Sequence, residues 1–95
     1  MSDIAELQGL IAAWADQVVP CRTPMSTVAK LLEEVGELIA SDRMEDPQEL
    51  ADVAILVLDL FTLQGVDMSQ AVREKMWVNC QRHWIVADNG AARHA

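Results

Sequence analysis

The chain has 95 residues and a mass of 10.5 kDa, which leaves room for one domain. Hydrophobic residues make up 52% of it and charged residues 23%, a globular balance that excludes intrinsic disorder as the main state. The net charge of −8 comes from 15 acidic and 7 basic residues, and it argues against duplex nucleic acid as a partner because an acidic surface repels phosphates.

Short segments and the number of cysteines argue against three further classes of protein. The N-terminus lacks a basic segment followed by an apolar one, so we expect no secretory signal. Uninterrupted apolar runs such as residues 53–58 are far too short to cross a membrane. The two cysteines, Cys21 and Cys80, do not make a disulfide scaffold. We therefore expect a cytoplasmic protein with reduced thiols and no membrane partner.

Start and stop signals predict four helices, of which the first two flank a proline-containing connection. The first helix runs from about Asp3, which can act as its cap, to about Gln17. The second begins with Thr23 as N-cap and Pro24 as its first residue, and it continues to about residue 40.

The third predicted helix opens with Asp46 as N-cap and Pro47 behind it, and it stops near Gly65. It is apolar nearly all round, so we expect most of its sides to be buried. Four helices of this length cannot easily enclose such a helix in a monomer this small. A homo-oligomer that buries the outer face is the simpler solution, and a tightly packed monomer is the alternative.

The fourth predicted helix is capped by Asp67 and runs to about Trp84. The fold class is therefore all-α, a four-helix bundle completed by homo-oligomerisation. We expect a single helical domain over residues 1–87 and a flexible C-terminal tail over residues 88–95.

Acidic residues are concentrated between residues 33 and 59, a segment that contains nine acidic residues and one basic residue. Glu34 and Glu37 are three apart and share a helix face, and so do Glu49 and Asp52 on the next helix. The short connection lets an antiparallel hairpin bring both pairs to one level. Four carboxylates without histidine favour a hard dication, Mg²⁺ first and Mn²⁺ second.

A solvated acidic face is the alternative interpretation, since most charge runs are exposed. Asp52 favours the metal site, because its apolar neighbours make it hard to leave in open water and an unpaired buried carboxylate is costly. Cys80 and His83 form an isolated pair, which disfavours zinc. Asp59 lies on the same stripe as Asp52; it has no assigned role, and pairing with a basic residue of a neighbouring helix or subunit is one interpretation.

The acidic residues belong to a longer pattern that carries a family resemblance. The sequence E-E-V-G-E at residues 33–37, followed after 11 residues by E-L-A-D at 49–52, resembles the E-E-x-x-E…E-x-x-D signature of the MazG-like all-α NTP pyrophosphohydrolases. Residues 75–84 are similar to the Lys…Asn…Arg segment that follows this signature. The Arg-Thr-Pro lead-in at 22–24 resembles most the phage and prophage dATP/dGTP diphosphohydrolase branch, and the resemblance covers about residues 14–84.

The resemblance implies an α-helical dimer or tetramer that depends on Mg²⁺ and cleaves a nucleoside triphosphate to monophosphate and pyrophosphate. By motif match, the residues implied as metal ligands are Glu34, Glu37, Glu49 and Asp52. The residues implied as substrate contacts are Lys75, Asn79 and Arg82.

The residues themselves permit this chemistry, because phosphoryl transfer needs charge neutralisation and in-line positioning more than covalent help. A carboxylate that a metal does not fully use, Glu37 or Glu33, is the candidate general base for the attacking water. The three implied substrate contacts have spacings of four and three, so they form a polar stripe suited to phosphate oxygens. An ordinary surface stripe on an amphipathic helix is the alternative.

Base recognition needs an apolar slot, for which the three tryptophans are candidates. Packing is the alternative for each, and Trp14 is favoured because it precedes the proline-containing connection. Arg22, in that connection, is a candidate contact for phosphate or base, with simple exposure as the alternative.

We therefore predict an Mg²⁺-dependent nucleoside triphosphate pyrophosphohydrolase that acts on purine deoxynucleotides. For the same fold, dCTP, dUTP and phosphoribosyl-ATP are alternative substrates. A non-catalytic helical oligomerisation or regulatory module is the alternative outside enzymes.

Overall fold

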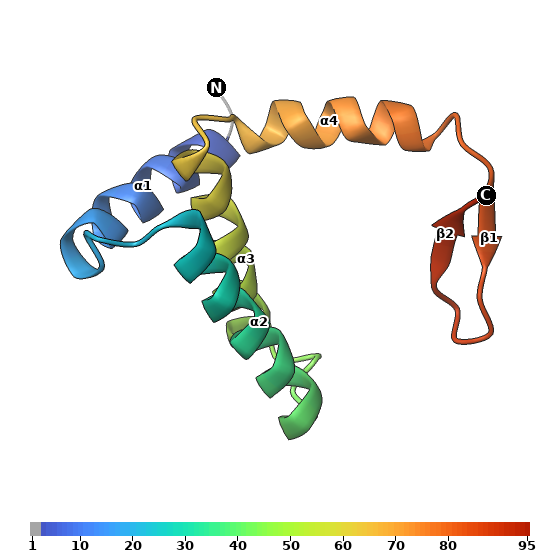
Figure 1. The fold of residues 1–95 in the computed structure, drawn as a ribbon, viewed down its shortest axis with the longest axis horizontal. Helices are drawn as coiled ribbons and strands as arrows, with labels where there is room; N and C mark the ends of the chain where they lie inside the picture. The colour runs from blue at the N-terminus through green and yellow to red at the C-terminus, as the bar shows by residue number, and fades with distance from the viewer. Residues whose placement is uncertain (1–2) are drawn as a thin grey trace.

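The computed structural model describes residues 3–95, which form four helices and a small β-hairpin (Figure 1). The elements in chain order are α1 (Asp3–Val18), α2 (Pro24–Ser41), α3 (Pro47–Leu63), α4 (Met68–Asn79), β1 (Trp84–Val86) and β2 (Ala92–His94). The predicted four-helix architecture is confirmed. No helix in the described part of the chain is both long and apolar enough to cross a membrane.

Three of the four predicted caps, Thr23, Asp46 and Asp67, are confirmed by their geometry, whereas Asp3 lies within α1 as its first described residue. The Thr23 hydroxyl accepts a hydrogen bond from the backbone N–H of Ser26 at 3.1 Å, and the Ser26 hydroxyl accepts one from the N–H of Thr23 at 2.8 Å. Asp46 and Asp67 each accept a bond from the N–H two residues further on. Such caps satisfy backbone donors at the helix starts and contribute about 1 kcal/mol each.

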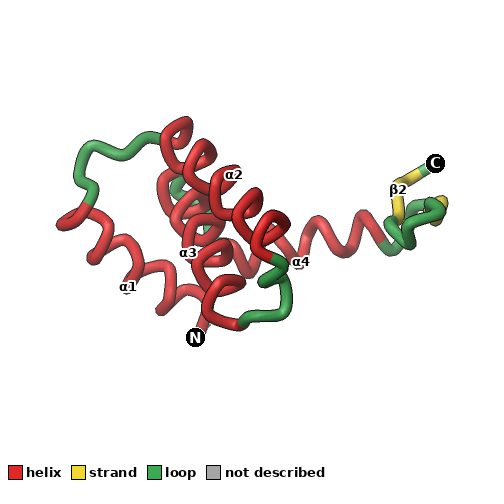
Figure 2. The backbone as a smooth tube through the Cα atoms, turned by 90° about the horizontal axis from the view of Figure 1, so that it is seen from below, coloured by secondary structure: helices red, strands yellow, loops and turns green. Residues whose placement is uncertain are grey.

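The two central helices, α2 and α3, form an antiparallel hairpin with a tight connection at residues 42–46. Asp42 ends α2 in the left-handed conformation, with φ 57°, and its N–H donates to the carbonyl of Leu38. This turn reverses the chain within a few residues. The start of α3 therefore lies beside the end of α2, and α1 packs on α3 towards the open end (Figure 2).

The protomer is open rather than compact. Its accessible surface is 7230 Å², against about 5,400 Å² for a typical folded monomer of this mass. Its radius of gyration is 15.4 Å, against about 12 Å for a compact chain of 95 residues. α4 leads away from the other helices, and the β-hairpin lies beyond it, away from α1, α2 and α3 (Figure 1). A single copy therefore leaves much of its apolar surface uncovered.

A single copy does not bury the third helix on most sides, as its size led us to expect, and burial of the outer face in a homo-oligomer stays a prediction. Leu58 and Asp59 are the buried residues of α3, whereas Leu50 is 45% exposed. The reason is that α4 departs from the far end of α3 and does not cover the first turns of α3 (Figure 1).

The C-terminal prediction needs correction as well. α4 ends at Asn79 rather than near Trp84, and part of the predicted tail pairs with β1 as strand β2, in antiparallel register. The Asn89-Gly90 dipeptide makes the turn, with Gly90 at φ 88° and the Asn89 side chain accepting the N–H of Ala91. Asn-Gly is a hairpin-turn signal, and the prediction did not use it. The domain boundary at residue 87 stays a prediction.

A buried glutamine fixes the direction in which α4 leaves the body. The side-chain amide of Gln8, in α1, donates to the hydroxyl of Thr62 at 3.1 Å and to the carbonyl of Val66 at 3.0 Å. Its oxygen accepts the backbone N–H of Met68 at 3.0 Å. Because Gln8 is buried, breaking these bonds would leave polar groups unsatisfied. The α3–α4 turn is therefore tied to α1.

A buried ion pair joins the connection between α1 and α2 to α3. Arg22 donates through Nε to Asp59 Oδ2 at 2.6 Å and through Nη2 to Asp59 Oδ1 at 2.9 Å. The two side chains are only 9% and 5% exposed. The third guanidinium nitrogen contacts the exposed Asp16. The bonds to Asp59 raise the pKa of Arg22 above its ordinary value, and Asp59 thereby gains the role that the sequence did not assign.

We predict that Asp59→Ala destabilises the protein by about 3 kcal/mol, because it leaves a buried guanidinium without its main partner. The double variant Arg22→Met/Asp59→Leu should lose clearly less than the sum of the two single variants. Urea unfolding followed by circular dichroism measures both. Equal losses of unfolding free energy in Asp59→Ala and in the exposed control Asp16→Ala would show that the Arg22–Asp59 pair does not stabilise the fold.

Candidate active site

Three carboxylates converge near the closed end of the α2–α3 hairpin. Glu34 comes from α2, and Glu49 and Asp52 come from the first turns of α3. One oxygen atom of each lies within 4.8 Å of the others. The structure thus brings together three of the four predicted metal ligands. The tight turn explains this, because it sets the third turn of α2 against the first turns of α3.

The donor set fits a hard dication. All three groups offer oxygen, the ligand that Mg²⁺, Mn²⁺ and Ca²⁺ prefer. Oxygens on one such ion lie up to about 4–5 Å apart, given metal–oxygen distances of 2.0–2.6 Å. The observed spread is in this range, so a dication would need only side-chain adjustment.

The argument from the burial of Asp52 is corrected by the structure. Asp52 is exposed in the protomer, as is its neighbour Leu50. Apolar neighbours in sequence did not bury it, because the packing of α2 against α3 leaves the Asp52 side chain exposed. Convergence with Glu34 and Glu49, rather than desolvation of Asp52, supports a metal site here.

Glu37 lies beside the cluster without belonging to the group of three. Its pKa is raised above the ordinary value, chiefly by the negative charge of Glu34, then by desolvation, a hydrogen bond with Glu34 and the charge of Glu33. Glu37 and Glu49 line the same hollow of about 360 Å³ next to the turn. Its raised pKa is a property expected of a general base, the role the sequence suggested for it.

Two cations border the carboxylates from opposite sides. Arg43, in the turn, donates through Nη1 to Glu49 Oε1 at 3.0 Å. Lys30 Nζ, on α2, lies 3.4 Å from Glu34 Oε1 and 3.5 Å from Glu33 Oε1. These contacts raise the pKa of Lys30, with the charge of Glu33 as the largest cause. Glu33 is exposed and contacts Lys30 rather than the group of three.

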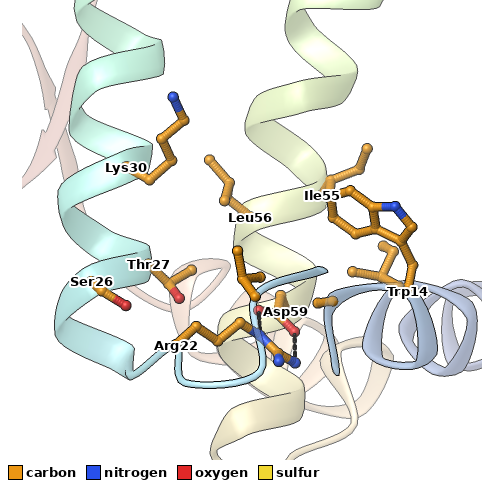
Figure 3. Close-up of a pocket in the computed structure, with 11 residues that line it drawn as sticks. Trp14, Arg22, Ser26, Thr27, Lys30, Ile55, Leu56 and Asp59 are labelled. Atoms are coloured by element: carbon orange, nitrogen blue, oxygen red, sulfur yellow. Dashed lines mark hydrogen bonds and ion pairs between the residues drawn. The ribbon is translucent and has the colours of Figure 1, made fainter. Parts of the chain in front are cut away.

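A pocket of about 390 Å³ lies between α1, α2 and α3 (Figure 3). Trp14 and Ile55 form one wall, and the Arg22–Asp59 pair closes the bottom. Lys30 lines the pocket on the α2 side. The structure therefore places Trp14 and Arg22, two predicted substrate contacts, at one pocket. Arg22 is not simply exposed there, because Asp59 and Asp16 hold its guanidinium.

The remaining predicted substrate contacts lie elsewhere in the protomer. Lys75 is exposed on α4, Asn79 is its half-buried last residue, and Arg82 lies beyond the helix end. The predicted helical stripe therefore stops at Asn79. No contact between α4 and α2 exists within residues 3–95, and α4 leads away from the carboxylates (Figure 1). One protomer does not join these residues to the acidic cluster.

Asn79 has an unusual environment for the end of an exposed helix. Its side-chain oxygen is buried without a hydrogen-bond partner, while its backbone carbonyl accepts the indole N–H of Trp84 at 2.8 Å. Trp77 is 69% exposed, and Trp84 lies 6.1 Å from His94, ring centre to ring centre. Neither of these tryptophans is near the pocket in this protomer.

The fold and the paired acidic motifs define a MazG-like nucleotide pyrophosphohydrolase. A solved structure described as cyanophage S-2L MazG-like pyrophosphohydrolase bound to dGDP and three catalytic Mn²⁺ ions per active site matches with a TM-score of 0.89 and 58% identity. The match covers 100% of this chain and 99% of that one. The predicted enzyme class and the MazG-like resemblance are confirmed.

The chain belongs to the dATP/dGTP pyrophosphohydrolase family, whose model matches residues 7–95. The dATP/dGTP diphosphohydrolase of cyanophage S-2L is 60% identical over 91 residues, covering 96% of this chain and 87% of that protein. The dATP/dGTP diphosphohydrolase of Salmonella phage PMBT28 is 42% identical over 91 residues. In that case the match covers 96% of this chain but only 31% of the longer relative.

We predict that Glu37→Gln raises the melting temperature of the metal-free protein at pH 7. A carboxyl whose pKa is raised on folding opposes folding once it is ionised, so its contribution falls as pH rises through the raised value. The gain should therefore shrink towards pH 4, because a protonated Glu37 is as neutral as the glutamine that replaces it. Melting curves in a metal chelator at both pH values measure it, with Glu6→Gln on α1 as control. A gain that is independent of pH would contradict the electrostatic cause.

Proposed function

We propose that this protein hydrolyses purine deoxynucleoside triphosphates to the monophosphate and pyrophosphate, with Mg²⁺ or Mn²⁺ as cofactor. The observation that carries the proposal is the convergence of Glu34, Glu49 and Asp52 beside a pocket large enough for a small ligand. The names of the two phage relatives, and the dGDP and Mn²⁺ named with the solved structure, support the choice of substrate and metal.

The site divides into a base end and a phosphate end. The apolar wall with Trp14 and Ile55 suits a purine, which stacks and excludes water there. Lys30 lines this pocket and also lies 3.4 Å from Glu34, so the pocket and the carboxylates are neighbours along α2. A nucleotide with its base in the pocket would direct its phosphates towards the carboxylates.

The bound dication would neutralise phosphate charge and lower the pKa of a bound water. Glu34, Glu49 and Asp52 would hold it, with Glu37 as the fourth predicted ligand. Glu37, or else Glu33, would accept the proton of the attacking water. The new bond joins the water oxygen to the α-phosphorus. The bond that breaks joins the α-phosphorus to the oxygen that bridges the α- and β-phosphates, and this oxygen leaves with pyrophosphate.

The predicted substrate contacts on α4 and just after it favour a homodimer or homotetramer. Residues 68–95 carry four basic and two acidic residues, whereas residues 1–67 carry three basic and thirteen acidic ones. The C-terminal part of one copy is therefore attracted to the acidic hairpin of another. Lys75, Asn79 and Arg82 would reach the phosphates in this way. The open protomer, with apolar side chains exposed on every helix, supports the same arrangement.

A substrate panel tests the proposed reaction. We predict that dATP and dGTP with Mg²⁺ or Mn²⁺ release pyrophosphate faster than dCTP, dUTP or phosphoribosyl-ATP. Glu34→Gln should lower the rate at least about 100-fold, because it removes a charge from the metal site. Coupled pyrophosphate detection measures both. If the unmodified protein releases no pyrophosphate from any of these nucleotides with either metal, the proposal is overturned.

Mixing inactive variants tests the shared site. Glu34→Gln and Lys75→Ala lie in different parts of the chain, so a mixed dimer with contacts in trans keeps one intact site. We predict that mixing them restores about a quarter of the unmodified activity if dimers form at random.

The control mixture is Glu34→Gln with Asp52→Asn, which should recover nothing because both changes affect the same carboxylate cluster. Subunit exchange is verified by native mass spectrometry. Failure of the first mixture to recover activity despite exchange would place Lys75 outside the site of the partner.

A further inference from the structure

Among the residues that the structure describes, Lys30 is the one that lines the pocket and also contacts the carboxylate cluster. Its ammonium group lies 3.4 Å from a Glu34 oxygen and 3.5 Å from a Glu33 oxygen. The side chain is 50% exposed, and it extends from α2 on the pocket side (Figure 3). These distances and this exposure describe a loose contact that the side chain can leave without breaking a packed structure.

The other cations near the site are held differently. Arg22 also lines the pocket, but it is 9% exposed and its guanidinium is engaged by Asp59 and Asp16. Arg43 pairs with Glu49 and lines the hollow at the turn, not the pocket. Among the described residues, Lys30 is therefore the cation between pocket and carboxylates that is free to turn.

We propose that Lys30 is an exchangeable counter-ion of this site. It neutralises Glu34 in the metal-free protein and turns to the phosphate nearest the nucleoside when a divalent cation engages Glu34. This inference rests on the proposed metal and nucleotide site and adds a positioning residue to it.

Simple electrostatics favours the exchange. A dication interacts with Glu34 with twice the charge of an ammonium group, so it displaces a loosely held lysine. The released ammonium then lies between the base pocket and the carboxylates, where the first phosphate of a bound nucleotide must pass. A lysine on a flexible stem suits this role, because it acts as a point charge without a fixed geometry.

The proposal gives two effects of opposite sign in Lys30→Gln. Affinity for Mn²⁺ alone should rise about threefold, because a repelling and competing charge is gone. Affinity for dGDP in saturating Mn²⁺ should fall about tenfold, because a phosphate contact is lost. Titration calorimetry measures both without any turnover, and a merely structural lysine would not move them in opposite directions.

Two further variants serve as controls. Lys30→Arg should keep both affinities near those of the unmodified protein. Arg73→Gln, which makes the same change in net charge on exposed α4, should leave Mn²⁺ affinity unchanged. If the unmodified protein binds Mn²⁺ and dGDP but the two affinities of Lys30→Gln stay constant or move together, the inference about Lys30 is overturned. If the unmodified protein binds neither, the proposed site itself is overturned, and the inference with it.

Discussion

Repulsion between like charges at the closed end of the α2–α3 hairpin is the constraint around which this protein is organised. Three carboxylates from two helices lie within a few ångströms, which opposes folding unless cations compensate. Lys30 and Arg43 supply part of that compensation from opposite sides, and the raised pKa of Glu37 shows that it is incomplete. A site that is left short of positive charge in this way is well prepared to bind a dication.

The hairpin tolerates this repulsion because its other end is held by buried polar contacts. The apolar core of a protomer is small, and the Arg22–Asp59 pair and the amide of Gln8 join the connections to the helices. Both contacts are specific in direction, so they position as well as stabilise. The first closes the bottom of the pocket, and the second directs α4 away from the body.

In the oligomer that we propose, this directed departure of α4 would link catalysis to assembly. Residues 68–95 have an excess of basic residues, and residues 1–67 have a large excess of acidic ones. Within one copy, α4 does not contact α2, which carries part of the acidic cluster. In the proposed oligomer, the same contact would cover apolar surface and supply positive charge to the phosphates. Stability and substrate binding would then depend on the same interface.

The sequence by itself determined the helices, their caps and the acidic pairs, because these follow from local spacing and capping chemistry. It did not reveal the partner of Asp59 or the burial of Gln8, since these depend on residues far apart in the chain. The end of α4 was missed because the local Asn-Gly turn signal beyond it was not used. It misjudged Asp52, because apolar neighbours along a helix do not bury a side chain unless another element covers it. Only the tertiary structure placed Lys30 between pocket and carboxylates, since that position depends on how three helices pack.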